Sequence, residues 1–182
     1  MGEHGREGVI GRGEVLALIQ RSARRREFEL RRGGARIGWL RFPPGRRSVA
    51  EASAGAVGPL ALTAGSGRVE ARGGGDGGIV ATVERGRRGV AVVRVAGAPA
   101  LGWRRGGPGH RWVVDGDGGD LLRVAATQGL LRASVGVTVQ RAMPERSLEL
   151  LCLLGGFLAL RELQAEVDAS AAVGGIVATG AG

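Results

Sequence analysis

The chain has 182 residues, a length typical of one domain, and its 26 basic residues, all arginine, outnumber 17 acidic residues to give a formal net charge of +9. A single cysteine, Cys152, excludes an intramolecular disulfide, and the N-terminus lacks the long apolar stretch of a secretory signal peptide. We therefore predict a cytoplasmic protein, and because the net charge favours an anionic partner, peripheral association with the inner face of the membrane is a further option.

Residues 1–26 are predicted to form a basic N-terminal segment outside the main domain. Apolar residues followed by arginines fit a short amphipathic helix, which could lie on an anionic membrane with its arginines near the headgroups. The alternative, which we favour because short basic stretches are common, is a helix packed on the outside of the domain with a solvated basic end. The apolar residues are Val15, Leu16, Leu18 and Ile19, and the arginines are Arg24, Arg25 and Arg26.

The region from Glu27 to Val139 is predicted to form roughly ten to twelve short strands, separated by Gly-rich turns. In REFELRRGGARIGWLRF, apolar and polar residues alternate on both sides of Gly33–Gly34, which indicates a hairpin. Further strands are predicted in GRVEARGGGDGGIVATVERG, GVAVVRVAG, ALGWRRG and HRWVVDGDGGDLLRVAAT. ASVGVTVQ has the clearest period of two, which places Val135, Val137 and Val139 on one face.

One acidic turn has the composition of a cation site. DGDGGD brings together Asp115, Asp117 and Asp120, and carboxylates at this spacing can surround Ca²⁺. The distant bidentate Glu of an EF-hand is absent, and strands are predicted on both sides. We therefore favour a hairpin turn and predict no metal site.

A second group of arginines has an aromatic neighbour. Arg104, Arg105 and Arg111 lie near Trp103 in the sequence and could bind an anionic lipid or the phosphate backbone of a nucleic acid, with the indole stacking on a base. We favour the alternative, in which these are charges at strand ends around a buried indole.

No catalytic motif is recognisable, so we predict neither an enzyme nor a cofactor. His4 and His110 are far apart and lack the partner spacing of a metal site. Cys152 lies in an apolar run, where it should pack as a small hydrophobic residue rather than act as a nucleophile.

The most apolar stretch, SLELLCLLGGFLALRELQAEV, predicts a helix over residues 144–167. Its apolar run is shorter than the roughly 20 residues that a bilayer span requires. Because the apolar residues face all directions around the axis, the helix must be surrounded by protein or by lipid, and we favour protein. Gly155 and Gly156 indicate close packing there, and residues 169–182 are predicted to be a flexible tail.

An antiparallel sheet can close around such a helix, which removes its exposed edges and covers every side of the helix. The order of hairpins, the HRWVVDGDGGDLLRV hairpin, the SVGVTVQ strand and the terminal LELLCLLGGFLALREL resemble the tubby-like β-barrel superfamily, which includes phospholipid scramblases, LURP-one-related proteins and many bacterial proteins. This resemblance implies a mainly β fold, a closed antiparallel barrel of twelve strands around a C-terminal hydrophobic helix, over residues 27–168.

The leading hypothesis is a non-catalytic barrel that binds anionic lipid or a membrane-proximal protein partner. A soluble barrel that binds nucleic acid is the first alternative, and a protein inserted into the membrane through its C-terminal helix is the second. The sequence carries no prediction of oligomeric state.

Overall fold

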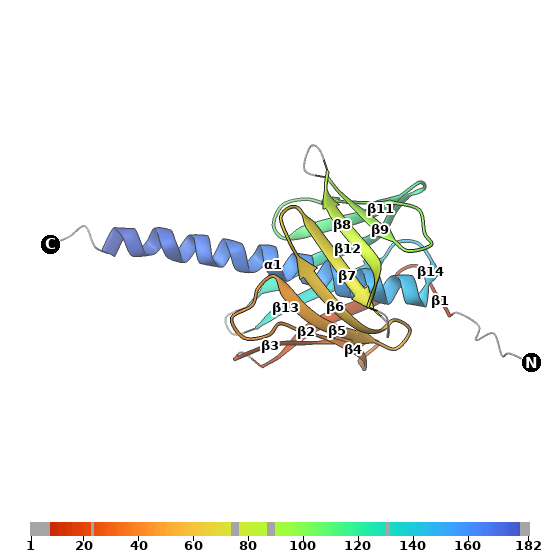
Figure 1. Ribbon diagram of the computed structural model, residues 1–182, viewed down its shortest axis with the longest axis horizontal. Coiled ribbons are helices and arrows are strands. Elements are labelled where there is room, and N and C mark those ends of the chain that lie inside the picture. Colours follow the sequence, from red (N-terminus) through yellow and green to blue (C-terminus); the bar gives the residue numbers. More distant parts are fainter. Residues whose placement is uncertain (1–7, 23, 74–76, 87–89, 130–131, 179–182) are drawn as a thin grey trace, which may run out of the picture.

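The computed structural model describes residues 8–22, 24–73, 77–86, 90–129 and 132–178; for residues 171–178 it describes the helical backbone. Twelve of its strands form one closed antiparallel barrel around a single helix, as the sequence predicts (Figure 1). Their order around the barrel is β10-β11-β12-β13-β2-β3-β4-β5-β6-β7-β8-β9. The barrel strands are β2 (Val15–Ser22), β3 (Arg25–Arg32), β4 (Ala35–Arg41), β5 (Val49–Ala54), β6 (Gly58–Ala64), β7 (Arg68–Gly73), β8 (Gly78–Arg85), β9 (Ala91–Val95), β10 (Leu101–Arg105), β11 (Arg111–Gly116), β12 (Gly119–Gln128) and β13 (Ala133–Val139).

The predicted hairpins are present in the barrel. Gly33 and Gly34, with φ angles of 55° and 85°, form the turn between β3 and β4, because two consecutive left-handed residues match the twist of the flanking strands. Along β13, Val135, Val137 and Val139 are fully buried and their neighbours are not. The period of two therefore decides which side chains fill the barrel.

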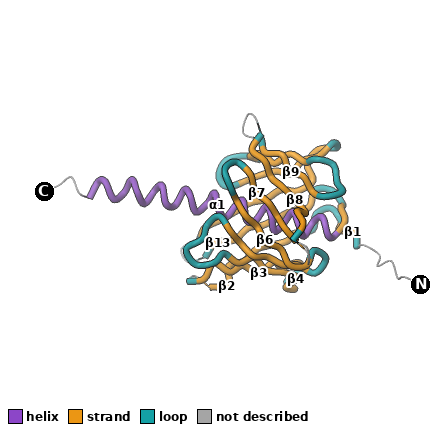
Figure 2. Tube along the Cα trace, in the orientation of Figure 1, coloured by secondary structure: helices purple, strands orange, loops and turns teal. Residues whose placement is uncertain are grey.

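The helix α1 (Glu145–Ala178) passes through the barrel and extends beyond it (Figure 2). Apart from the half-buried Leu158, its apolar residues from Leu148 to Leu163 are buried against the inward side chains of the strands. Each fully buried leucine contributes about 1.5–3 kcal/mol. The core is therefore one layer of strand side chains packed on all sides of the helix.

The two adjacent glycines of the helix allow this close fit. A Cβ atom at Gly156 would overlap the Cδ1 methyl group of Leu18, and one at Gly155 would lie 3.1 Å from Cζ3 of Trp103. The predicted close packing at this pair is confirmed, since both positions have barrel side chains directly against the helix backbone.

The predicted N-terminal amphipathic helix is wrong. Residues Val15–Ser22 form strand β2, which pairs with β13 on one side and β3 on the other, so the barrel begins before residue 27. Leu16, Leu18 and Gln20 are buried and alternate with outward-facing residues. The short segment fits either periodicity, and the backbone hydrogen bonds of two neighbouring strands favour the extended form.

The predicted end of the helix is also wrong, because α1 continues as far as Ala178 rather than ending near residue 167. The four residues 179–182 of the predicted flexible tail lie outside the described residues. A two-stranded sheet that the sequence did not predict joins β1 (Val9–Ile10) to β14 (Met143–Pro144) directly before the helix. Pro144 therefore ends a strand, and Glu145 is the first helical residue.

Within the described residues, none of the helical structure is both long enough and apolar enough to cross a bilayer.

Candidate anion-binding surface where the helix leaves the barrel

The barrel has two mouths, and α1 leaves through the one that we call the exit mouth. The turn between β2 and β3, the loop between β4 and β5 and the loop between β10 and β11 lie there, because antiparallel strands place alternate connections at the same end. Two contacts tie these connections to the helix: Arg47 forms an ion pair with Asp168, and His110 Nε2 lies 3.3 Å from Glu166 Oε2. The opposite mouth is marked by the 2.6 Å ion pair between Arg32 and Glu145 at the helix start.

A groove of about 600 Å³ at the exit mouth is rich in positive charge. The β2–β3 turn and the β4–β5 loop form its walls, and Gln164 of the helix forms part of its base. Its charged side chains are six arginines and two glutamates: Arg24, Arg25, Arg26, Arg41, Arg46, Arg47, Glu27 and Glu51.

Two of these arginines are already neutralised. Arg41 pairs with Glu51, and Arg47 pairs with Asp168. Arg24, Arg25 and Arg46 are exposed and have no ion-pair partner within the described part of the chain. The groove therefore has an excess of positive charge that the described residues do not neutralise.

Arg26 is the most buried arginine of the groove. Its guanidinium lies 4.2 Å from the centre of the Phe42 ring, in a cation–π contact. Burial lowers the pKa of Arg26, and the positive charge of Arg47 lowers it further. Since an arginine side chain stays protonated, an anion in the groove would reduce the electrostatic cost of this half-buried charge.

The second predicted group, Arg104, Arg105 and Arg111, does not form one free patch. Arg104 donates to Asp115 at 2.6 Å and to Asp120 at 3.0 Å, and the hydrogen bond to Asp115 is the main cause of its raised pKa. Arg105 lies 3.0 Å from Glu162. Arg111 is exposed, without an ion pair in the described residues, and lies apart from the groove. Only Arg111 is therefore available to an anion.

The less favoured possibility, in which Trp103 stacks on a base, does not fit the structure. The Trp103 side chain is buried, with its ring 6.0 Å from that of Trp112 in a stacked arrangement inside the barrel. The alternative, charges at strand ends around a buried indole, is what the structure shows.

The acidic turn forms a hairpin, as favoured. Asp115 and Asp120 pair across β11 and β12, and both carboxylates accept hydrogen bonds from Arg104. No cluster of metal-ligating side chains occurs among the residues that the structure describes, which include Asp115, Asp117 and Asp120.

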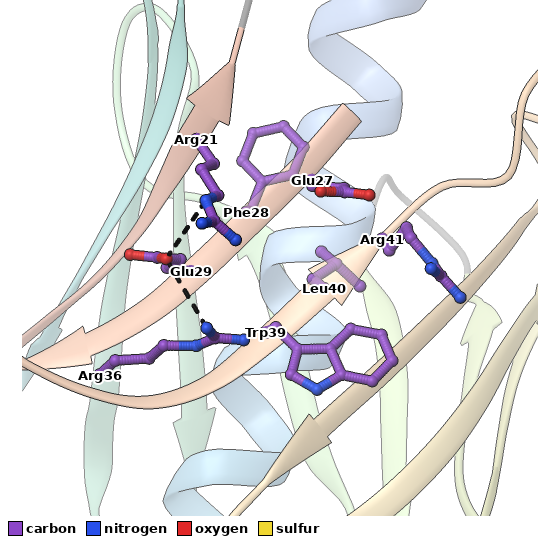
Figure 3. Close-up of a pocket in the computed structure, with 8 residues that line it drawn as sticks. All are labelled: Arg21, Glu27, Phe28, Glu29, Arg36, Trp39, Leu40 and Arg41. Carbon is purple, nitrogen blue, oxygen red and sulfur yellow. Dashed lines mark ion pairs between the residues drawn. The ribbon is translucent and has the colours of Figure 1, made fainter. Parts of the chain in front are cut away.

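A smaller hollow of about 220 Å³ lies on the outer wall of the barrel, over β2, β3 and β4 (Figure 3). Glu29 lies between two arginines of the hollow, 4.0 Å from Arg21 and 3.8 Å from Arg36, and the Trp39 indole also lines the hollow (Figure 3). A hydrogen bond from Arg31 lowers the pKa of Glu29, and these arginines lower it further. Because Glu29 balances the neighbouring arginines, this hollow is less suited to an anion than the groove.

The buried thiol is not suited to nucleophilic chemistry. Cys152 is fully buried inside the barrel, and burial raises its pKa far above the usual range. It packs as the small hydrophobic residue that the sequence predicts.

Comparison with known proteins supports the fold alone. No protein-family model matches the chain, and no curated protein matches it in sequence. Among solved structures, the chain is similar to the X-ray structure of a protein from Arabidopsis thaliana, with a TM-score of 0.50 and 14% identity over 79% of this chain and 89% of that one. The barrel fold therefore occurs in a solved structure, whereas the resemblance to the tubby-like superfamily stays a prediction.

Sequence reasoning identified Arg24, Arg25 and Arg26 but placed them on a separate helix. It did not connect them with Arg41, Arg46, Arg47 or Gln164, which line the same groove. The sequence does contain a signal for this surface, because the connections between successive antiparallel strands alternate between the two mouths of the barrel. Once residues 15–22 are taken as a strand, the connections after β2 and after β4 must lie at the same mouth.

Proposed function

We propose that the protein is a non-catalytic barrel of the tubby-like superfamily that binds the surface of an anionic membrane through its exit mouth. The observation that carries the proposal is the groove in which Arg24, Arg25 and Arg46 have no acidic partner in the described chain. Guanidinium groups bind phosphate through paired hydrogen bonds, and an anionic leaflet presents many phosphates on one surface.

Nucleic acid is the less favoured partner, because the indole that could have stacked on a base is buried. A membrane-proximal protein partner with an acidic surface would use the same arginines. The net charge and the single buried cysteine support a cytoplasmic location, with recruitment to the inner face of the membrane.

The proposal is tested by flotation of the purified protein with phosphatidylglycerol vesicles and with phosphatidylcholine vesicles, at low and high salt. We expect flotation with the anionic vesicles only, weakened by salt and retained with excess DNA. A protein that stays at the bottom of the gradient under every condition contradicts the proposal.

A pair of matched variants locates the surface. R24S/R25S removes two charges at the exit mouth, and R12S/R146S removes two exposed arginines near the opposite mouth that have no ion pair among the described residues. Both variants therefore have the same net charge. At about 1 kcal/mol per arginine near a membrane surface, the first variant should bind roughly tenfold to thirtyfold more weakly. The second should bind nearly as the natural chain does. Equal losses in both would mean that net charge, rather than the groove, causes binding.

A further inference from the structure

We propose that a second pocket at the exit mouth binds a free fatty acid of medium length, with the alkyl chain against the barrel wall and the carboxylate against Arg161. We call it the helix-side pocket, because Leu158, Arg161 and Ala165 of α1 form one of its sides. The inference goes beyond the proposed function, since this pocket shares no lining residue with the arginine-rich groove and binding to it requires no membrane.

The helix-side pocket lies between α1 and the ends of strands β7 to β10. The turn between β6 and β7 borders it, so it opens at the same mouth as the groove. Its volume is about 340 Å³, near the lower end of the range for small-molecule sites, about 300–1,000 Å³. Such a volume suits a single alkyl chain better than a lipid with two chains.

The wall of the pocket on the barrel side is apolar. Val69 and Val83 are directly opposite each other on β7 and β8, and Ala91 and Trp103 are directly opposite on β9 and β10. Residues opposite each other in antiparallel strands project from the same face of the sheet, and all four line the pocket. The half-buried Leu158 adds an apolar side chain from the helix. This wall favours an alkyl chain, because each methylene that packs on it is removed from water.

One arginine of the pocket is half-buried without an acidic partner. The guanidinium of Arg161 lies 5.5 Å from the centre of the Phe157 ring, and no ion pair joins it to a carboxylate among the described residues. The adjacent Glu162 pairs instead with Arg105, at 3.0 Å. Burial lowers the pKa of Arg161, although the charge of Glu162 acts in the opposite direction. An anion in the pocket would therefore reduce the cost of burying this charge.

The charges around the pocket favour an anion with a single charge. Arg85 is exposed and has no ion pair among the described residues, whereas Arg68 is paired with Glu70 and Glu84. Glu162 also lines the pocket, and its charge would repel the second negative charge of a phosphate monoester. A carboxylate has one charge and can accept two parallel hydrogen bonds from a guanidinium. A carboxylate at the end of an alkyl chain therefore fits both parts of the pocket.

The test is calorimetric titration of the full chain with decanoate, below the concentration at which decanoate forms micelles. We expect one decanoate per chain and no measurable binding of acetate, which has the charge without the chain. Octanoate should bind up to about fifteenfold more weakly than decanoate, because two fewer methylenes are buried at about 0.8 kcal/mol each. Octanol should bind at least tenfold more weakly than octanoate, since it lacks the charge. Several decanoates per chain, or equal binding of octanol and octanoate, would overturn the proposal.

A charge variant locates the carboxylate. Arg161→Gln should weaken decanoate binding roughly tenfold to a hundredfold, because a hydrogen bond between charged groups is lost. Arg146→Gln is the matched control at the start of the helix, where Arg146 is exposed and has no ion pair among the described residues. It should bind decanoate within about twofold of the natural chain. Urea denaturation shows that both variants fold, and equal effects of the two would contradict the role of Arg161.

A second variant fills the pocket without changing its charge. Ala165 is exposed and lines the pocket, so Ala165→Phe places a ring in the space for the alkyl chain and should weaken decanoate binding at least tenfold. Val167→Phe places the same ring about 200° further around the helix, at another exposed position, and should change binding less than twofold. Unchanged binding by Ala165→Phe would contradict the site.

The outcomes are distinct from those of the proposed function. R24S/R25S alters the groove and should leave decanoate binding within about twofold, because neither arginine lines the helix-side pocket. Loss of decanoate binding in R24S/R25S but not in Arg161→Gln would place the ligand in the groove and overturn this inference. Flotation of the natural chain without decanoate binding also overturns it and leaves the proposed function intact. Decanoate binding without flotation overturns the proposed function alone.

Discussion

At the scale of single residues, Gly156 shows how little space separates the helix from the barrel. Gly156→Ala adds a methyl group where the Leu18 side chain already lies, and overpacking of this kind costs about 1–3 kcal/mol. Alanine regains about 1 kcal/mol of helix propensity, so the expected net loss in the free energy of unfolding is up to about 2 kcal/mol. Urea denaturation measures it.

Gly155→Ala is the matched variant, with the same gain in propensity. Its new methyl group would lie 3.1 Å from Trp103, a contact that small movements can relieve. We expect it to be close to neutral. If Gly156→Ala were as stable as Gly155→Ala, the close approach of Leu18 to the helix would be wrong.

Glu149 is a carboxylate in the core of the barrel. Only 2% of the residue is exposed, and one oxygen accepts a 2.7 Å hydrogen bond from the backbone N–H of Ala56 in the turn between β5 and β6. Burial raises the pKa of Glu149, although this hydrogen bond acts in the opposite direction, and Glu145 raises it further. Arg32, which lowers it, pairs more directly with Glu145.

Because the pKa of Glu149 is higher in the folded state than in the unfolded state, protonation of its carboxyl group stabilises the folded protein. The contribution of Glu149 to stability is therefore fully present below the unfolded pKa of about 4.5 and is lost as pH rises through the folded pKa. Glu149→Gln stays neutral and can still accept from Ala56. The free energy of unfolding of the Glu149→Gln variant, relative to that of the natural chain, should therefore rise as pH increases from about 4.5 through the folded pKa of Glu149. Urea denaturation at a series of pH values measures the difference, and a difference that falls with pH would contradict the raised pKa.

At the scale of elements, the seam between β9 and β10 is the shortest pairing in the barrel. Its register joins only Leu101, Gly102 and Trp103 to β9, whereas β12 and β13 pair from Leu122 to Gln128. Short pairings open with the least free energy. We expect amides of β9 and β10 to exchange hydrogen faster than those of β12 and β13, which NMR or mass spectrometry can measure. Equal protection would mean that the barrel opens only as a whole.

Individual elements were predictable from the sequence where two local signals agree. The hairpin around Gly33–Gly34 and strand β13 were predictable because turn chemistry and a period of two agree there. Segment Val15–Ser22 was not, because its apolar residues fit both a helix and a strand, and pairing with β13 and β3 decides between them. The end of the helix at Ala178 was also not predictable, because the local sequence pattern after residue 167 does not distinguish a helix from a flexible tail.

The candidate site was predictable residue by residue but not as a surface. Arg24, Arg25 and Arg26 stand out in the sequence, whereas their proximity to Arg46 depends on closure of the barrel. Arg104 illustrates the converse, since an arginine that looks free in the sequence is held by Asp115 and Asp120.

At the scale of the whole molecule, Cys152 reports on the integrity of the barrel. The thiol is fully buried among helix and strand side chains, so reagent can reach it only when the helix leaves the barrel or the barrel unfolds. We expect its reaction with a thiol reagent to follow global unfolding in urea. Rapid reaction in native buffer, at a rate independent of urea, would mean that the interior opens locally.

The helix that fills the barrel follows every barrel strand in the chain. During synthesis the strands therefore emerge before the side chains that they must enclose, and their inward faces have nothing to close upon until α1 has been made. Contacts between the first strands and the helix span more than a hundred residues, as in the ion pair between Arg32 and Glu145. Such distant contacts form slowly. The nascent chain should consequently stay unfolded until the helix has been synthesised. Until then it should depend on chaperones to prevent aggregation.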